Sequence, residues 1–322
     1  MARLSFFGAV LRSRARRSVI FLTRRKTDRH VNWNSHRVTT ILENALAEDK
    51  ATSDATTYAC IDVHQRATAM VLAKQDCVIS GLGAISRVLE VFGKLDGTVT
   101  AHPEVTSHPE IFDGVRVHVG QSVAVIRHNA RVLLSCERVI LNVLQRLSGI
   151  ATLTRQFVDS VAGTRVRILD TRKTIPGFRV LDKYGVVCGG GFNHRLDLSD
   201  GVLIKNNHIA LAGGIAQTLE RAHRNRRGPQ PLEIEVRSLK ELDTALENGA
   251  EAVLLDNMSV VEVIAAVERC RKHTRRIPVE CSGGINLENV RAYAETGVDF
   301  ISVGALTHSV PAVDLSLRMT PA

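Results

Sequence analysis

At 322 residues, with 44% hydrophobic side chains and a mean hydropathy of +0.02, the chain has the composition of a soluble globular protein with one large or two smaller domains. No apolar run approaches the roughly 18 to 20 residues of a membrane helix, which excludes a membrane-spanning protein. The six cysteines show neither CxxC nor zinc-ligand spacing, so we expect a reduced, cytoplasmic protein.

The net charge of +9 comes entirely from the N-terminal arm, residues 1–37. The arm holds ten Lys and Arg and one acid, Asp28, whereas the rest of the chain carries 32 charges of each sign. Such an arm could bind nucleic acid, direct the protein to a compartment, or be a disordered extension. It lacks the interleaved aromatics of a base-stacking segment and the apolar core of a signal peptide. We therefore favour a disordered extension and expect no nucleic-acid partner.

Residues 38–150 are predicted to form a small α+β domain. An apolar helical repeat begins near His36, and a strong helix is predicted at 137–152, where Ile140, Val143, Leu144 and Leu147 form one stripe. Short strands and one helix are expected between them. The strands are predicted at 67–73, 76–80, 115–118 and 123–127, and the helix at 82–92.

After residue 165 the pattern changes to alternating strand, loop and helix. Six nearly all-apolar strands are expected at 166–169, 201–204, 232–236, 252–255, 279–281 and 300–303, with helices at 215–223, 239–248, 260–271 and 287–296. Apolar strands alternating with helices are typical of a parallel sheet buried on both faces, and this spacing favours an α/β barrel. We assign this barrel domain to residues 151–310 and treat 311–322 as a separate C-terminal segment.

Charged side chains gather where these strands end, which is where barrels bind their ligands. Residues 169–209 hold seven basic side chains around a glycine triplet, as expected of a pocket for a polyanion. They are Arg172, Lys173, Arg179, Lys183, His194, Arg195 and Lys205. Carboxylates follow the next two strands at Glu235 and Asp256, and one or two carboxylates with substrate phosphates are the usual Mg²⁺ arrangement. Salt bridges to the basic cluster would explain the same two side chains.

The loops after the last two strands are rich in glycine, which lets backbone N–H groups approach phosphate oxygens. They contain Ser282, Gly283, Gly284 and Gly304. His194 has no second ligand at metal spacing, so a neutral histidine that donates to a carboxylate is expected. Lys205 is expected to bind a carboxylate, with a Schiff-base nucleophile as the alternative.

Together these motifs resemble those of the quinolinate phosphoribosyltransferases over residues 38–320. The resemblance rests on ERVILNVLQRLSGIAT at 137–152, LDTRKTIPGFR at 169–179, the KY…GGGFNHR…LIKNNHI stretch, PVECSGGI at 278–285 and FISVGALTHSVPAVDLSL at 300–317. Two departures are Asn206, where the family usually has an acid, and Gly185, where it usually has alanine.

The resemblance implies an N-terminal α/β sandwich followed by an open α/β barrel with fewer than eight strands. It implies transfer of phosphoribosyl from phosphoribosyl pyrophosphate to quinolinate, with decarboxylation and with Mg²⁺. A homodimer with shared active sites is implied, and the C-terminal segment returns to the first domain. The alternatives are a nicotinate-specific transferase, a molybdenum-operon paralogue or a Schiff-base lyase.

The resemblance also assigns roles to individual residues. Lys173, Glu235 and Asp256 are implied to be catalytic, and the two carboxylates to hold magnesium and ribose. The quinolinate and pyrophosphate ligands are implied to be Arg172, Lys173, His194, Arg195 and Lys205, joined by Arg138 from the neighbouring subunit. The implied ligands of the 5′-phosphate are Ser282, Gly283, Gly284, Gly304 and His308.

Overall fold

The computed structural model describes residues 31–97, 103–228 and 231–322, which fold into two compact units. The sheet unit comprises residues 31–155, 174–190 and 306–322, and the barrel unit comprises 156–173 and 191–305 within the described ranges. Most of the predicted arm, residues 1–30, lies outside the described residues. The remainder is folded, since Val31 and Trp33 pack on the hydrophobic core and His36 begins a helix.

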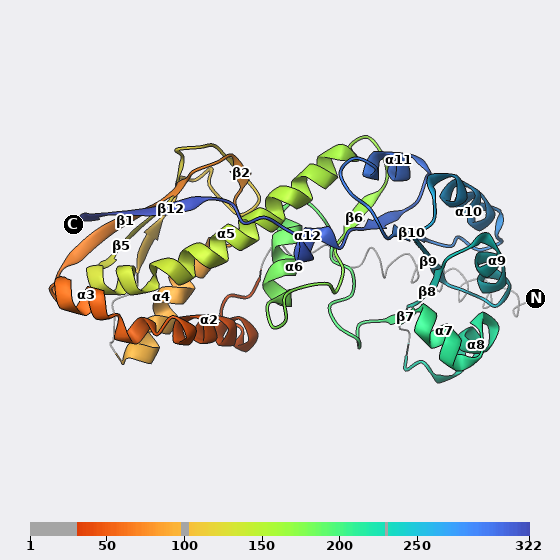
Figure 1. The fold of residues 1–322 in the computed structure, drawn as a ribbon, viewed down its shortest axis with the longest axis horizontal. Coiled ribbons are helices and arrows are strands. Elements are labelled where there is room, and N and C mark those ends of the chain that lie inside the picture. Colours follow the sequence, from red (N-terminus) through yellow and green to blue (C-terminus); the bar gives the residue numbers. More distant parts are fainter. Residues whose placement is uncertain (1–30, 98–102, 229–230) are drawn as a thin grey trace, which may run out of the picture. The chain divides into compact units, whose positions relative to one another are not determined.

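The sheet unit is built around an antiparallel sheet with the strand order β12-β1-β5-β3. Its long strands β1 (Arg66–Ala73) and β5 (Ser122–Asn129) alternate buried and more exposed side chains, as a sheet covered on one face requires. The outer strands are β3 (Glu104–Thr106) and β12 (Leu315–Pro321). Figure 1 shows β1 between β5 and the C-terminal strand β12.

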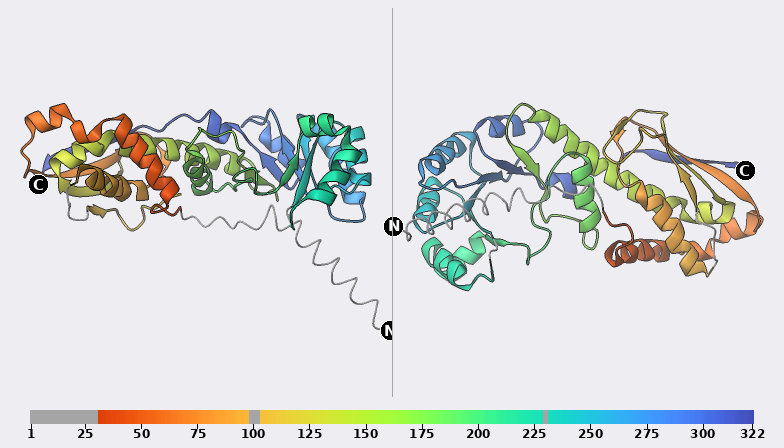
Figure 2. Two further views of the ribbon diagram at one scale, coloured as in Figure 1. Left: turned by 90° about the horizontal axis from the view of Figure 1, so that it is seen from below. Right: turned by 180° about the vertical axis from the view of Figure 1, so that it is seen from behind.

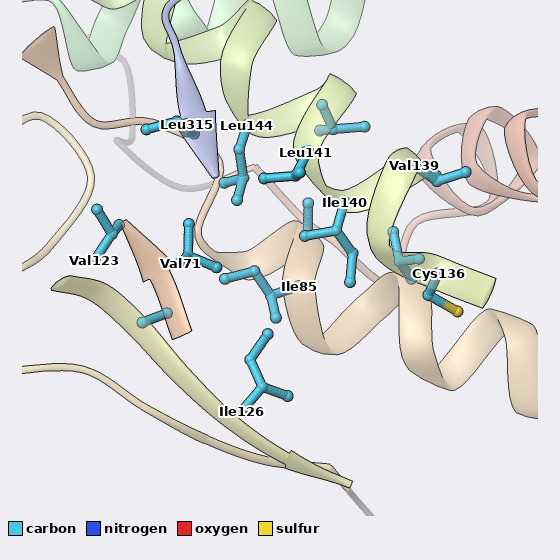
Figure 3. Packing of buried hydrophobic residues seen from close by; sticks show 14 of the residues in the cluster. Val71, Ile85, Val123, Ile126, Cys136, Val139, Ile140, Leu141, Leu144 and Leu315 are labelled. Atoms are coloured by element: carbon cyan, nitrogen blue, oxygen red, sulfur yellow. The ribbon is translucent and has the colours of Figure 1, made fainter. Parts of the chain in front are cut away.

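Helices pack on the covered face of this sheet. In α2 (His36–Glu48) the Ser35 side chain caps the first turn, and the buried stripe is Val38, Leu42 and Leu46. Figure 3 shows Ile85 and Ile140 interdigitating with Val71 and Ile126 of the sheet. The other elements of this unit are α3 (Ala55–Cys60), β2 (Cys77–Val78), α4 (Gly83–Asp96), β4 (Arg116–Val117), α5 (Ala130–Ser160, in this unit to Arg155), α6 (Arg179–Cys188) and, from Leu306, α12 (Ala305–His308).

The barrel unit contains six parallel strands in the order β6-β11-β10-β9-β8-β7, with β6 and β7 at the two ends. This is the open α/β barrel that was predicted. The strands are β6 (Arg167–Leu169), β7 (Val202–Ile204), β8 (Leu232–Val236), β9 (Ala252–Asp256), β10 (Val279–Ser282) and β11 (Phe300–Ser302). Every predicted barrel strand is present, within two residues at either end.

Helices follow these strands and lie along the outside of the sheet (Figure 2). They are α7 (Asn206–Ala212), α8 (Ile215–Asn225), α9 (Leu239–Glu247), α10 (Val260–Lys272) and α11 (Val290–Glu295). The Ser238 and Ser259 side chains cap the first turns of α9 and α10. In α10 the Glu262 carboxylate also accepts the backbone N–H of Ser259, which completes a capping box. No helix in the described ranges is both long and apolar enough to cross a membrane.

Residues 174–190 fold with the sheet unit, although they lie within the segment 151–310 that was predicted as the barrel domain. The reason is the close approach of α6 to α5. A Cβ atom on Gly189 would lie 2.5 Å from the Ala151 carbonyl oxygen, and one on Gly185 would lie 3.0 Å from Ile150. Glycine at these positions lets the two helix backbones pack together.

Candidate active site

The barrel strands present a polar face at their carboxyl ends. In β8 the apolar Leu232, Ile234 and Val236 alternate with Glu233 and Glu235. Residues paired in register, and residues two apart in a strand, share one face of a sheet. Register therefore carries this face from β7 through β11, and it includes Lys205, Glu235, Asp256, Ser282 and Ser302.

Lys205, Glu235 and Asp256 form a charged group on this face. Lys205 Nζ lies 3.8 Å from Glu235 Oε2, the geometry of an ion pair. Burial raises the pKa of Glu235, and the neighbouring Asp256 raises it further, while Lys205 and the Asn206 backbone N–H lower it. The substitution of asparagine for the family's acid at 206 thus leaves Lys205 paired with Glu235. Two carboxylates this close would both gain from a shared cation.

A turn that needs glycine follows Asp256 and β10. Asn257 has a positive φ of 54°, donates its backbone N–H to the Ser282 carbonyl at 2.9 Å, and donates Nδ2–H to Asp256 Oδ1 at 3.0 Å. Gly283 has φ 95°, and a Cβ there would lie 2.3 Å from Asn257 Oδ1. Gly284 is also left-handed, with φ 65° and no neighbour near its Cβ position. The loop therefore keeps open backbone beside the carboxylates.

Two arginines of the barrel unit, Arg172 and Arg195, lie close together. Arg195 is 8% exposed and donates to the Gly201 carbonyl at 3.4 Å. Burial lowers the pKa of Arg195, and the nearby Arg172 guanidinium lowers it further. Arg172 Nε is buried with no hydrogen-bond partner among the described residues. Two neighbouring guanidiniums, one with an unsatisfied N–H, have the chemistry to bind an anion. Lys173, the next residue, is exposed.

His194 lies in a buried cluster that sequence reasoning did not find. Its Nε2 is 3.4 Å from Glu280 Oε2 and 3.5 Å from Glu233 Oε2. Ser302 Oγ donates to the other Glu280 oxygen at 2.5 Å. The His194 backbone N–H donates to the buried Asp170 at 2.8 Å. A histidine facing carboxylates was expected, but its partners were not.

The hydrogen bonding of His194 determines its tautomer. The backbone N–H of Arg195 points at Nδ1, 2.7 Å away, and a backbone N–H can only donate. Nδ1 therefore carries a lone pair and the ring proton lies on Nε2, facing the carboxyl groups. A metal-binding histidine has the reverse pattern, with one nitrogen on the ion and the other donating. Although His194, Glu233 and Glu280 lie close enough together to suggest a metal site, the tautomer of His194 favours an ion-pair contact between the ring N–H and the two carboxyl groups.

The cluster also retains a proton. Burial disfavours a charged imidazolium, whereas the neighbouring Glu280 and Glu233 favour a proton beside them and raise the pKa of His194 above its ordinary value. Burial and the Glu280 charge likewise raise the pKa of Glu233. Since the Arg195 N–H occupies Nδ1, the additional proton belongs on the carboxyl side of the cluster.

Four other predicted residues belong to the sheet unit. Arg138 is exposed on α5, and His308 is exposed at the end of α12 with Nδ1 2.5 Å from Ser309 Oγ. Arg179 donates to Thr174 Oγ1 at 3.0 Å, and Lys183 is buried. The barrel unit thus holds five of the seven basic residues that were expected to form one pocket. Gly304 follows β11 in the barrel unit, as predicted from the sequence.

Sequence reasoning missed Glu233, Glu280 and Ser302. A signal for the first was present, because a buried strand reading LEIEV places two acids on one face, and only the second was considered. The role of Ser302 depends on strand order, which no local pattern specifies.

Two family models match the chain, and together they span most of it. The quinolinate phosphoribosyl transferase N-terminal domain matches residues 54–148, and the C-terminal domain of the same family matches residues 150–318.

Individual relatives agree with these matches. A nicotinate-nucleotide pyrophosphorylase [carboxylating] from Mycobacterium leprae is 42% identical over 280 residues, covering 86% of this chain and 95% of that protein. The crystal structure of NadC from Streptococcus pyogenes superposes with a TM-score of 0.83 at 34% identity, over 91% of this chain and all of that one. A nicotinate-nucleotide pyrophosphorylase structure from Ehrlichia chaffeensis gives a TM-score of 0.79 at 38% identity, covering 87% and 98%. The chain belongs to the quinolinate phosphoribosyl transferase family.

Proposed function

We propose that the carboxyl ends of the barrel strands catalyse phosphoribosyl transfer from phosphoribosyl pyrophosphate to the ring nitrogen of quinolinate. Carbon dioxide, pyrophosphate and nicotinate mononucleotide are the products, so the enzyme serves NAD biosynthesis. Relatives named carboxylating pyrophosphorylase or decarboxylating quinolinate phosphoribosyltransferase support this assignment. The observation that carries it is that one barrel holds two neighbouring guanidiniums, Arg172 and Arg195, as well as two neighbouring carboxylates, Glu235 and Asp256.

The cations bind the aromatic acid. Arg172 lies close enough to Arg195 to disfavour the charge of Arg195, so a bound dianion would offset an electrostatic penalty. Lys173 and Lys205 are exposed near the same strand ends and add charge for the second carboxylate or for pyrophosphate. A site built for two carboxylates should discriminate strongly against an analogue with one.

Glu235 and Asp256 are the candidate ligands of Mg²⁺ and ribose. Their oxygens are the hard donors that this ion prefers, and their mutual repulsion favours a bound cation. Bound magnesium would neutralise charge on the departing pyrophosphate. The same carboxylates oppose the positive charge that develops on ribose.

The remaining chemistry requires positioning. Quinolinate must lie with its nitrogen beneath C1′ of ribose, which the arginines achieve by holding both carboxylates. Once the nitrogen carries ribose, the cationic ring stabilises the carbanion left by carbon dioxide. No side chain of unusual pKa is needed for that step. The open backbone of Gly283 and Gly284, with Ser282 and Gly304, is the proposed cradle for the 5′-phosphate.

The subunit arrangement and cellular setting are further parts of the proposal. Arg138 and His308 would complete the site, with Arg138 donated by the second subunit of a homodimer. The described cysteines form no disulfide, which suits a reducing, cytoplasmic environment.

A single assay tests the reaction. The protein is supplied with phosphoribosyl pyrophosphate, Mg²⁺ and either quinolinate or nicotinate, and mononucleotide and carbon dioxide are followed together. We expect one carbon dioxide per mononucleotide from quinolinate, and almost no product from nicotinate. Comparable turnover of nicotinate would indicate a nicotinate-specific transferase. Borohydride trapping of Lys205 with substrate would instead indicate a Schiff-base lyase.

The role of the carboxylates is tested by Asp256→Asn, which keeps the shape but removes the charge. We expect kcat/KM for phosphoribosyl pyrophosphate to fall by about a hundredfold or more and its Mg²⁺ dependence to weaken, because the ligand charge is lost. Quinolinate binding measured by calorimetry should persist. Equal loss of both ligands together with a lower Tm would point to a structural role.

A further inference from the structure

Glu280 is a buried acid on the interior face of the barrel, one residue pair nearer the strand starts than Ser282. It is fully buried, as is Glu233 on β8. Neither belongs to the carboxylate group at Glu235 and Asp256. Burying an ionisable side chain is unfavourable unless partners compensate for the lost water, so the contacts of Glu280 indicate its role.

The contacts of Glu280 form a chain toward the substrate edge. Ser302 Oγ donates to one carboxyl oxygen at 2.5 Å, which fixes the plane of the group. The other oxygen lies 3.4 Å from His194 Nε2, which carries the ring proton. His194 Nδ1 accepts the backbone N–H of Arg195 at 2.7 Å. Every step lies within the barrel unit.

We propose that Glu280 is a positioning residue for Arg195. Glu280, which accepts from Ser302 Oγ, favours the Nε2–H tautomer of His194. The Nδ1 lone pair of His194 then accepts the backbone N–H of Arg195, which orients the backbone from which the Arg195 side chain extends. Glu233 faces the same ring nitrogen, with its Oε2 at 3.5 Å. The inference rests on the proposed role of Arg195 as a quinolinate ligand.

The reason for such a device is geometric. Residues 189–201 contain several glycines and, between Phe192 and Gly201, no regular secondary structure. A loop of this kind does not by itself keep the Arg195 guanidinium aligned with the carboxylates of a planar dicarboxylic acid. Because misplacement of a bound group by about 1 Å can cost about a hundredfold in rate, a rigid support for the loop has a direct catalytic value.

The first test is spectroscopic and measures the tautomer of His194 in the unmodified protein. Nitrogen NMR of the full-length protein labelled at histidine, with His194 assigned by comparison with His194→Asn, reports the tautomer. We expect the Nε2–H form with an unprotonated Nδ1 at neutral pH. A protonated Nδ1 would overturn the proposal, whether or not the protein acts on quinolinate.

The second test compares Glu280→Leu, which removes the acceptor, with Glu280→Gln, which can keep an oxygen facing His194. For Glu280→Leu we expect the quinolinate Kd from calorimetry to rise about tenfold or more, as for loss of a buried hydrogen bond. KM for phosphoribosyl pyrophosphate should change less than about twofold, within the range of a neutral substitution. Glu280→Gln should recover most of the quinolinate affinity, and Ser302→Ala should give an intermediate loss.

Glu251→Gln is the matched control. Glu251 forms a half-buried two-bond ion pair with Arg226 in the same unit, at 2.7 and 2.8 Å, remote from the strand ends that bind substrate. We expect a lower Tm with unchanged quinolinate Kd. The proposal fails if Glu280→Leu behaves like this control, or if both substrates weaken equally. Absence of quinolinate binding by the unmodified protein would overturn the proposed function, while the tautomer result would still test this inference.

Discussion

At the scale of single residues, Asn257 and Gly283 interlock. Asn257 adopts a left-handed backbone and occupies the space where a side chain on Gly283 would begin. In doing so it places its amide against Asp256. Two strand ends are thereby fixed relative to each other, so the loop beside the carboxylates has a defined shape before substrate arrives.

Gly283→Ala tests this interlock. The new methyl group meets Asn257 and also strains the backbone at φ 95°, so we expect a large rise in KM for phosphoribosyl pyrophosphate and a fall in stability of about 1–3 kcal/mol. Gly213→Ala is the control, because φ there is 93° but no atom lies within 4 Å of the new Cβ. It should lower Tm without affecting KM. Equal effects of both substitutions on KM would show that the clash with Asn257 has no functional role.

Some of the site could be predicted from residues and some could not. Lys205, Glu235 and Asp256 could be predicted as site residues because each stands at the end of a predicted strand. The carboxyl ends of parallel strands meet at one edge of the sheet whatever the strand order. The cluster around Glu280 depends on β10 lying between β9 and β11, and on a loop that brings His194 into contact with Glu233 of β8. Pairings of this kind join residues far apart in the chain, and no local periodicity encodes them.

At the scale of elements, glycines set the spacing between α5 and α6. Gly185 stands where the family usually has alanine, and a Cβ there would lie 3.0 Å from Ile150 and 3.1 Å from the Leu147 carbonyl oxygen. A methyl group could fit at these distances if the neighbouring atoms moved by a few tenths of an ångström. This agrees with the alanine that the family usually has at this position. The helix itself was not predicted, because its glycine and the surrounding charged residues obscured its periodicity.

Asp54 links two helices and provides a test of pH dependence. It caps α3 by accepting from the Thr57 N–H at 3.0 Å, and it accepts from Ser135 Oγ of α5 at 3.2 Å. Burial opposes the charged form, but the bonds from Thr57 and Ser135 prevail and lower the pKa of Asp54. A lowered folded-state pKa contributes stability that is fully present above the ordinary pKa of 3.8 and is lost as the pH falls through the folded value.

We therefore expect Asp54→Ala to lower stability by about 1 kcal/mol at neutral pH. The difference in Tm from the unmodified protein should shrink as the pH falls below about 4, where the unmodified carboxyl also becomes protonated. Asp54→Asn keeps a capping oxygen, so its Tm at neutral pH should lie between the Tm of the unmodified protein and that of Asp54→Ala. A gap that stays constant from neutral to acidic pH would show that the carboxylate charge is not what stabilises this junction.

At the scale of the whole molecule, the proposed exchange of Arg138 between subunits is open to a direct test. Arg138→Ala and Lys173→Ala should each be nearly inactive. If the site is shared, mixing the two variants under conditions of subunit exchange should restore part of the activity, because one site in each mixed dimer contains both native residues. Failure to recover activity despite demonstrated exchange would show that each subunit supplies its own Arg138.

The sheet unit is assembled from three stretches of the chain, and its edge is completed by the last of them. β1 pairs with β5 on one side and, through residues 315–321, with β12 on the other. During synthesis β1 emerges some 240 residues before its partner, as the register of Ala73 with Leu315 shows. Until then one side of β1 is an unpaired strand edge, a template for association with other chains. Nascent or C-terminally truncated chains should therefore be the aggregation-prone and chaperone-dependent species of this protein.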